Sequence, residues 1–497
     1  MIPSLGFKRS GCSETGQHPA IRAYDLCVSA KNPNSPTQTR SVSARRDDAL
    51  AGSDIVELLD RIRRREVNAN ELILAARERA ANVDPQLNAV ADWLPNEVTG
   101  TGPFAGVPTF LKDNEDLAGS VTSHGSAAVP RVVRNTSTAF PKHLQDLGFT
   151  MIGKTTLPEF GLTATTESIR FGPTRNPWNP NHSTGGSSGG SAALVAAGVV
   201  PLAHANDGGG SIRIPASCCG LVGLKPTQGR LVPIEAMSHL PIKVATQGVL
   251  TRTVRDTALF YAEAEKLYQD PSLAPMDLVT EPNKARLRIG IFTRGFRGQQ
   301  VDADTATAVT QAGVLCESLG HSVEPIDFPF ADSLGPDFLR YWELLAWLVK
   351  RFGSQIYGNE FDRSKLEIFT VGLARHLGPS RERVPLSIAR LRKFARKYDQ
   401  HFDRFDVLVS PVLGHAPPQI GYLGTDVPFD THLIRLLRYA SFTPLQNISG
   451  APAISLPLGR SGHGLPIGVQ FAAPLGAERT LLELAFELEV AQPWQTL

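Results

Sequence analysis

Hydrophobic residues recur along this chain in two patterns, one with helical spacing and one of short continuous apolar runs. Ile55, Leu58 and Ile62 are spaced as on one face of a helix, and Asn68 with Glu71 has the pattern of a capping box that opens a second helix. Further helices are predicted at residues 138–147, 303–319, 333–352, 384–403 and 478–490, and strands at residues 149–152, 199–204, 287–293 and 407–409. Strands that alternate with helices predict an α/β architecture.

The first 48 residues differ in composition from the rest of the chain. They are rich in Ser, Arg, Asn and Pro, and no continuous apolar run follows the initial Met, so a secretory signal is not expected. We interpret residues 1–48 as a disordered N-terminal extension or as the result of a start codon placed too early, with a transit peptide as a further alternative. Residues 49–497 contain no internal repeat and no long linker, and they are predicted to form a single domain.

Charge and cysteine content exclude several classes of protein. The 497 residues include 50 basic and 48 acidic side chains, a net charge of +2, which favours neither nucleic acid nor an anionic membrane as a partner. No apolar run is long enough to span a bilayer. Five cysteines, few for this length, indicate a reducing, cytoplasmic setting, and the sequence has no HExxH or CxxC pattern. We expect neither a metal nor a cofactor.

Glycine-rich segments of the chain match several known patterns. Residues 148–155 fit the phosphate-binding pattern GxxxxGK[ST], but the intervening residues are strand-like and Pro158 prevents a helix start, so we interpret the match as coincidence. The pattern GxSxG, which occurs twice near Ser187, would need a strand just before the serine, whereas residues 175–184 have the composition of a loop. Because several histidines follow these serines in the sequence, the residue content alone does not exclude an α/β-hydrolase. A flexible linker at residues 185–191 is disfavoured because helix-forming residues follow at once.

Two serines in these segments, Ser187 and Ser211, carry the candidate chemistry. Serine is a weak nucleophile until a base removes its proton, and an attacked carbonyl needs hydrogen-bond donors for its oxyanion. Glycine lets the backbone approach a ligand closely and so provides such donors. The segments therefore predict an enzyme.

A series of motifs, in the same order, resembles those of the amidase signature enzymes. The motifs are Gly106-Val107-Pro108 with Lys112-Asp113-Asn114, and residues 185–193, 206–215, 220–227, 447–453 and 465–470. Together the similarity extends over roughly residues 50 to 495. The resemblance implies the amidase signature fold, in which helices on both faces cover a central, mixed and twisted sheet. It also implies an amidase that hydrolyses a small linear or cyclic carboxylic amide.

The resemblance assigns roles to the matching residues. Ser211 is expected to be the acylated nucleophile, Ser187 the bridging serine held in a cis peptide, and Lys112 the terminal base, with Ser188 in support. A lysine must be neutral to act as a base, and burial lowers its pKa. Neutral Lys112 could then accept the proton of Ser187 while Ser187 takes that of Ser211.

Residues around the two serines are expected to complete the site. The resemblance implies an oxyanion hole made by the backbone N–H groups of Gly208, Gly209 and Gly210, and we expect Asn447 to contact the substrate. Asp207 and Arg213 could form a charge-assisted pair that braces the turn of the nucleophile, because two solvated charges fit poorly in so apolar a stretch.

The sequence predicts the type of reaction in more detail than it predicts the substrate. Within the family the chain resembles amidases of the 6-aminohexanoate cyclic dimer hydrolase type, in residues 174–179, in Asn206-Asp207 and in Phe442-Thr443-Pro444. The alternative is the A subunit of a glutamyl-tRNA amidotransferase, although residues 231–247 lack the serine-rich stretch expected there. A non-catalytic relative is disfavoured because all three catalytic positions are filled. The expected partner is a small-molecule amide, bound by a monomer or homodimer.

Overall fold

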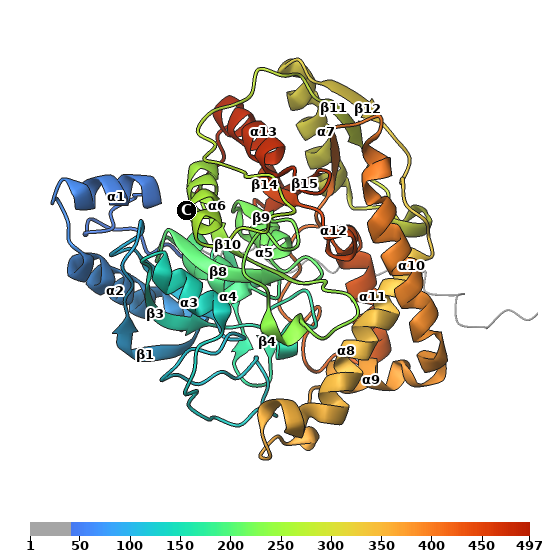
Figure 1. The fold of residues 1–497 in the computed structure, drawn as a ribbon, viewed down its shortest axis with the longest axis horizontal. Helices are drawn as coiled ribbons and strands as arrows, with labels where there is room; N and C mark the ends of the chain where they lie inside the picture. The colour runs from blue at the N-terminus through green and yellow to red at the C-terminus, as the bar shows by residue number, and fades with distance from the viewer. Residues whose placement is uncertain (1–40) are drawn as a thin grey trace, which may run out of the picture. The chain divides into compact units, whose positions relative to one another are not determined.

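Strands and helices alternate along the chain in a computed structural model that describes residues 41–497 (Figure 1). The described residues belong to one compact unit. Its largest sheet has six strands, and the order of the strands makes it mixed. In space they are β12 (Ser322–Pro325), β11 (Arg288–Ile291), β13 (Val407–Pro411), β15 (Pro466–Ala472), β14 (Ala453–Arg460) and β9 (Gly223–Lys225). β11 is parallel to both of its neighbours, and the remaining pairs are antiparallel.

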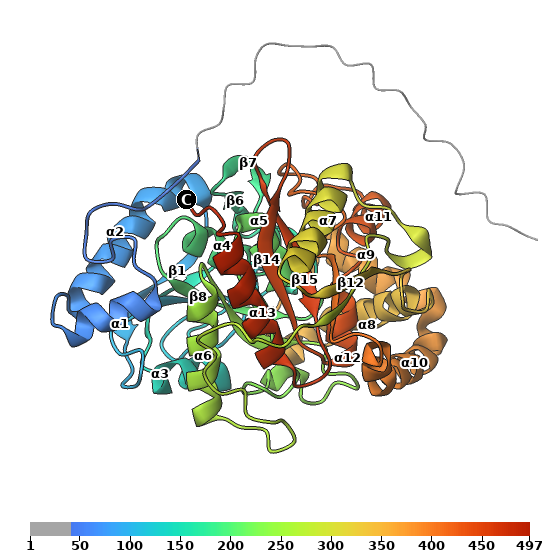
Figure 2. The same ribbon diagram turned by 90° about the horizontal axis from the view of Figure 1, so that it is seen from above.

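Helices pack on both faces of this sheet, as the predicted fold class requires. α7 (Ala303–Ser318) lies so close to β14 that a Cβ on Gly459 would collide with Ala308. On β15, the N–H of Gly468 donates to Ser217 Oγ of α5 (Arg213–Cys219) over 2.8 Å. Figure 2 shows α7 and α13 (Glu478–Ala491) beside β14 and β15. The α/β fold with helices on both faces is therefore confirmed.

Two smaller sheets extend the strand layer toward the N-terminal part of the domain. One has the order β1 (Val90–Val98), β3 (Thr150–Thr155), β2 (Pro108–Lys112), and the other pairs β8 (Leu202–Asp207) with β10 (Thr246–Thr251). The N–H of Lys112 donates to His204 Nδ1 at 3.1 Å, and an isolated bridge joins Val222 to Thr251. The first link holds the end of β2 against β8, and the second joins β10 to the segment before β9 of the large sheet.

The remaining helices have the following bounds: α1 (Ile55–Arg63), α2 (Ala69–Leu87), α3 (Ala139–Asp146), α4 (Gly189–Ala196), α6 (Val254–Leu267), α8 (Leu334–Tyr357), α9 (Ile368–His376), α10 (Val384–Lys397), α11 (Phe429–Tyr439) and α12 (Pro444–Ser449). The capping box of Asn68 and Glu71 at the start of α2 is confirmed, with both reciprocal hydrogen bonds formed. Short paired strands occur at β4 (Glu167–Ser168) and β5 (Gly172–Pro173). Among the described helices, none combines the length and apolar character needed to cross a bilayer.

Two predictions about strands differ from the structure. The strand predicted at residues 149–152 continues to Thr155, because Lys154 is buried in it with its Nζ 3.0 Å from Asp113 Oδ1. A hydrophobic pattern does not predict a buried strand position that is occupied by a charged residue, because the pairing partner that allows its burial lies elsewhere in the sequence. Residues 175–184, predicted as a loop, contain a small hairpin of β6 (Arg175–Asn176) and β7 (Asn179–Ser183).

The predicted boundary after residue 48 falls inside the packed region. The N–H of Val42 donates to Pro177 O at 2.8 Å, and that of Ala44 donates to Ala197 O at 2.7 Å. Asp48 pairs with the buried Arg79, at 2.5 Å between Oδ1 and Nη2. Residues 41–48 are therefore part of the domain, and the rest of the predicted extension, residues 1–40, lies outside the described residues.

Candidate active site

Lys112 is the last residue of β2, and its side chain is fully buried. Its Nζ lies 2.8 Å from Ser187 Oγ, 2.9 Å from Ser188 Oγ and 2.8 Å from Asn206 Oδ1. Three segments that are distant in sequence therefore meet at one amine: β2, the turn before α4 and the end of β8. The structure brings the predicted Lys112, Ser187 and Ser188 into direct contact.

Burial lowers the pKa of Lys112 from 10.5 to about 7, although the charges of Asp207 and Glu115 act in the opposite direction. Removing an ammonium group from water penalises its charged form, so the neutral amine is well populated near neutral pH. Behind the lysine, His204 accepts the Lys112 N–H at Nδ1 and faces Gln247 Oε1 at 3.0 Å with Nε2. Burial lowers the pKa of His204 to about 3, which keeps this ring uncharged.

Ser187 stands in the turn that leads into α4, and the peptide bond between Gly186 and Ser187 is cis. Gly161 lies close enough that a Cβ there would come within 3.0 Å of Ser187 Oγ. In the described part of the chain, no histidine is hydrogen-bonded to the hydroxyl of Ser187, Ser188 or Ser211. The arrangement at Ser187 therefore differs from that of a serine–histidine nucleophile elbow.

Ser211 follows three glycines and precedes α5. No hydrogen bond joins its hydroxyl to Ser187 among residues 41–497. Ser211 is only 8% exposed, and it lines the same cavity as Gly186, the neighbour of Ser187. Ser211 and the residue that precedes Ser187 therefore line one cavity.

The predicted oxyanion donors are not equivalent in the structure. The N–H of Gly210 donates to Asp207 Oδ1 at 2.6 Å and is not free for a ligand. Gly210 has φ +132°, and a Cβ at this position would collide with the Thr443 hydroxyl, so only glycine fits. Within residues 41–497, the N–H groups of Gly208, Gly209 and Ser211 have no hydrogen-bond acceptor, and Gly209 and Ser211 line the cavity. Gly210 is therefore corrected from an oxyanion donor to a structural turn residue.

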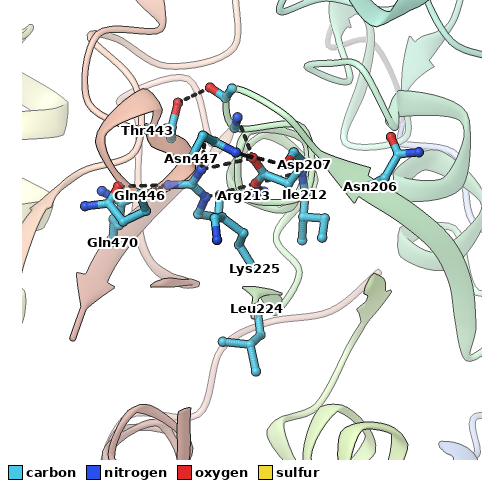
Figure 3. A network of polar contacts seen from close by, with 12 residues as sticks. Asn206, Asp207, Ile212, Arg213, Leu224, Lys225, Thr443, Gln446, Asn447 and Gln470 are labelled. Atoms are coloured by element: carbon cyan, nitrogen blue, oxygen red, sulfur yellow. Dashed lines mark hydrogen bonds and ion pairs between the residues drawn. The ribbon is translucent and has the colours of Figure 1, made fainter. Parts of the chain in front are cut away.

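Asp207 and Arg213 form the predicted pair (Figure 3), and both side chains are fully buried. Arg213 Nε lies 2.9 Å from Asp207 Oδ2, and Nη2 lies 3.0 Å from Oδ1. Asp207 also accepts from the backbone N–H of Gly210 and, at 3.2 Å, of Ile212. Burial alone would raise the pKa of Asp207, but the charge and hydrogen bonds of Arg213, with the amide of Asn447, lower it well below its usual value. The carboxylate therefore holds both backbone neighbours of Ser211.

The guanidinium of Arg213 uses all five of its N–H donors. Besides the two bonds to Asp207, it donates to Gln446 Oε1 at 3.0 Å, to Gln470 Oε1 at 2.8 Å and to Asn447 Oδ1 at 2.7 Å (Figure 3). Sequence reasoning missed Gln446 and Gln470, although Gln446 precedes Asn447 and Gln470 closes the last motif. Their proximity to Arg213 depends on the packing of α12 and β15 against α5.

Asn447 has a different role from the predicted one. It is 1% exposed, and its Nδ2 donates to Asp207 O and Oδ1, both at 2.8 Å, and to Val244 O at 3.0 Å. With its oxygen bonded to Arg213, the amide has no group left for a ligand. Asn447 is therefore corrected from a substrate contact to a part of the network under the nucleophile.

A cavity of about 320 Å³ opens in front of Ser211. Its walls are mostly apolar, and its lining includes Leu162, Ile214, Phe338, Leu339, Trp342, Leu436, Leu437 and Ile448. Phe338 and Trp342 of α8 lie over the glycine turn, and Trp342 Nε1 donates to Leu162 O at 3.0 Å. Polar side chains in the lining are few, among them Arg297, Gln299 and Asp332. This shape and chemistry suit a small, largely apolar ligand.

The site offers no obvious place for a metal. Over residues 41–497, no group of three or more His, Cys, Asp or Glu side chains is arranged to hold one. The groups available for chemistry are therefore the lysine amine, the serine hydroxyls and the free backbone N–H groups.

Comparisons with known proteins agree with this geometry. The family described as Amidase matches residues 55–482. The chain is 47% identical over 459 residues to "Putative amidase AmiC" of Mycobacterium tuberculosis (strain H37Rv), covering 90% of this chain and 96% of the relative. It is 34% identical over 483 residues to 6-aminohexanoate-cyclic-dimer hydrolase of Pseudomonas sp. (strain NK87), covering 90% and 95%.

Solved structures show the same similarity. A structure of 6-aminohexanoate cyclic dimer hydrolase matches with a TM-score of 0.80 and 31% identity, covering 90% of this chain and 98% of the other. The A subunit of glutamyl-tRNA(Gln) amidotransferase from Thermotoga maritima matches with a TM-score of 0.71 and 25% identity, covering 91% and 97%.

Proposed function

The chain belongs to the amidase signature family and is an amidase hydrolase, and from this premise we propose that Ser211, Ser187 and Lys112 form its catalytic relay. The observation that supports the relay most strongly is the contact of 2.8 Å between Lys112 Nζ and Ser187 Oγ in a fully buried setting. A lysine whose pKa is lowered to about 7 can act as a base near neutral pH.

The reaction proceeds through an acyl-enzyme. Neutral Lys112 Nζ takes the proton of Ser187 Oγ, Ser187 takes that of Ser211, and Ser211 Oγ attacks the amide carbonyl carbon. The N–H groups of Gly208, Gly209 and Ser211 are available to the oxyanion. The relay then returns the proton to the departing amine as the C–N bond breaks. Water hydrolyses the ester by the same route and regenerates Ser211.

The substrate that fits best is a small amide with an apolar body, linear or cyclic. The apolar lining and the volume of about 320 Å³ support this class. Similarity to the two 6-aminohexanoate cyclic dimer hydrolases makes that cyclic diamide a specific candidate. The amidotransferase subunit matches with lower identity, which favours a stand-alone amidase.

A panel of purified amides tests the proposal. Hexanamide, hexanoyl 4-nitroanilide, the 6-aminohexanoate cyclic dimer and glutamine are incubated with the wild-type enzyme and with Ser211→Ala and Lys112→Ala. We expect hydrolysis of at least one apolar amide by the wild type, and none above background with Ser211→Ala. Undiminished turnover by either variant would contradict the relay. Ammonia release from glutamine alone would support the amidotransferase alternative.

Two further properties stay predictions. We propose a reducing, cytoplasmic setting, which the buried and unpaired thiols of Cys218, Cys219 and Cys316 support. We also propose a monomer or homodimer, which sedimentation of the purified protein would test.

A further inference from the structure

The amine of Lys112 has three neighbours, and they differ in what each can do in a hydrogen bond. Ser187, Ser188 and Asn206 each place one oxygen within 2.9 Å of Nζ. An ammonium group has three donors and no acceptor, whereas the neutral amine has two donors and one lone pair. The bonds that the neighbours make elsewhere therefore decide where the lone pair points.

Asn206 can only accept from the lysine. Its Nδ2 donates to Asn114 Oδ1 at 3.1 Å, which fixes the orientation of the amide and directs Oδ1 at Nζ. An amide oxygen carries no hydrogen, so one N–H of the amine must be donated to it. Asn206 is the next-to-last residue of β8 and is only 6% exposed.

Ser188 can also accept from the lysine. The other acceptor near its hydroxyl is the backbone oxygen of Asn206, at a longer distance of 3.4 Å, and a hydroxyl that donates there turns its lone pairs to the lysine. A second N–H of the amine is donated to this oxygen. Ser187 is then the remaining neighbour whose hydroxyl hydrogen can reach the lone pair of the neutral amine.

We propose that Asn206, assisted by Ser188, is a positioning residue that fixes the direction of proton transfer in the relay. The two residues hold both N–H groups of neutral Lys112 and leave its lone pair for Ser187. In the transfer the O–H bond of Ser187 breaks and a third N–H bond forms on Lys112, while Ser187 takes the hydrogen of Ser211. The ammonium that results has one acceptor for each donor, so the lysine changes protonation state without moving. This inference rests on the proposed function of the relay.

Two nearby carboxylates already favour the protonated form of Lys112, so an uncharged acceptor at position 206 helps to keep the neutral amine populated. Glu115, which follows β2, and Asp207, which follows Asn206 on β8, both favour the ammonium form. His204, a residue of β8 whose ring contacts the backbone of Lys112, is uncharged because burial lowers its pKa to about 3. Neither carboxylate is hydrogen-bonded to Nζ. The β8 oxygen that accepts a hydrogen bond from Nζ belongs to the uncharged amide of Asn206. A carboxylate in its place would hold the lysine in its protonated, inactive form.

Asn206→Asp tests this with little change of shape. The readout is the second-order rate of Ser211 labelling by a fluorophosphonate, which releases fluoride and does not depend on the identity of the substrate. A carboxylate within hydrogen-bond distance of an ammonium shifts its pKa by roughly one to three units. We expect the acid limb of the labelling profile to move to higher pH by that amount. At pH 6 the rate should fall by about ten- to a thousandfold, with recovery at alkaline pH.

Two further variants make the test specific. Asn206→Leu keeps the branched shape but removes the acceptor, so the acid limb should move to lower pH and the plateau rate should fall by about tenfold. Asn359→Asp, at an exposed turn far along the chain, adds the same charge and should leave the profile unchanged. If Asn206→Asp does not fold, as judged by circular dichroism, the shift in Asn206→Leu decides the matter.

The outcomes separate this inference from the relay itself. A profile of Asn206→Asp that superimposes on the wild type, or that is lowered equally at every pH, overturns the positioning role, because a structural defect does not move a titration. An unshifted acid limb in Asn206→Leu overturns it as well. Lys112→Ala serves as the reference: if it labels at the wild-type rate, the relay is wrong. If it does not label and Asn206→Asp behaves as the wild type, only the positioning role is lost.

Discussion

Replacing Arg213 by Met should reveal how strongly the turn around Ser211 depends on the buried pair. The substitution keeps most of the side-chain length but removes five hydrogen bonds. It also leaves the Asp207 carboxylate fully buried without its cation. Breaking a buried pair by removing one partner costs about 3–5 kcal/mol, because the remaining charge is uncompensated. We expect a loss of this size in the free energy of unfolding.

Urea denaturation followed by circular dichroism measures the loss, and two comparisons identify its cause. Arg288→Met removes a surface pair in which Nη2 lies 2.8 Å from Asp406 Oδ1, and it should change stability far less because solvent screens both charges. The double variant Asp207→Asn/Arg213→Met should lose less than the sum of its single variants, since no buried charge is left unpaired.

Acid provides an independent check on the sign of the effect. The pKa of Asp207 is lowered in the fold, so the stability that this carboxylate contributes is present above about pH 4 and is lost as the pH falls further. In Arg213→Met, burial without the cation raises the pKa of Asp207 above its usual value, so the difference in stability between wild type and variant should begin to shrink above pH 4 and should shrink further as the pH falls. A loss in Arg213→Met no larger than that in Arg288→Met at pH 7 would refute the reasoning.

Three other predictions concern the reaction. Ser211→Ala should abolish hydrolysis of hexanoyl 4-nitroanilide with the melting temperature nearly unchanged, because Ser211 faces the cavity; turnover close to that of the wild type would reassign the nucleophile. Since the pKa of Lys112 is lowered to about 7 and the neutral amine is the base, wild-type kcat/KM should rise about tenfold per pH unit up to about pH 7 and then level off; a flat profile from pH 5 to 9 would argue against a lysine base. Trp342→Ala should lower kcat/KM for hexanamide and should raise the ratio of kcat/KM for bulkier anilides to kcat/KM for hexanamide, because the ring lines the cavity and contacts the glycine turn. If competition between the two substrates shows the same ratio in variant and wild type, Trp342 does not determine specificity.

Local patterns predicted the parts of this fold that local interactions hold together. The capping box at Asn68 and the ends of α7 and α13 agree closely with the prediction, since a cap and an apolar stripe are contained within a few residues. The strand β3 was predicted too short, because the partner that neutralises Lys154 is Asp113, in another part of the sequence. A hydrophobic pattern cannot reveal such a partner.

The sequence alone determined the α/β class, the family and the candidate residues Lys112, Ser187 and Ser211, because those motifs are contiguous runs of residues. Only the tertiary structure decided how they are used. In the structure the N–H of Gly210 and the amide of Asn447 are hydrogen-bonded within the protein and are not available to a substrate, and Asn206 accepts a hydrogen bond from the lysine amine. Each of these outcomes depends on a hydrogen bond between groups that the fold brings together. Burial, which sets the pKa of Lys112, likewise belongs to the packed molecule rather than to any segment.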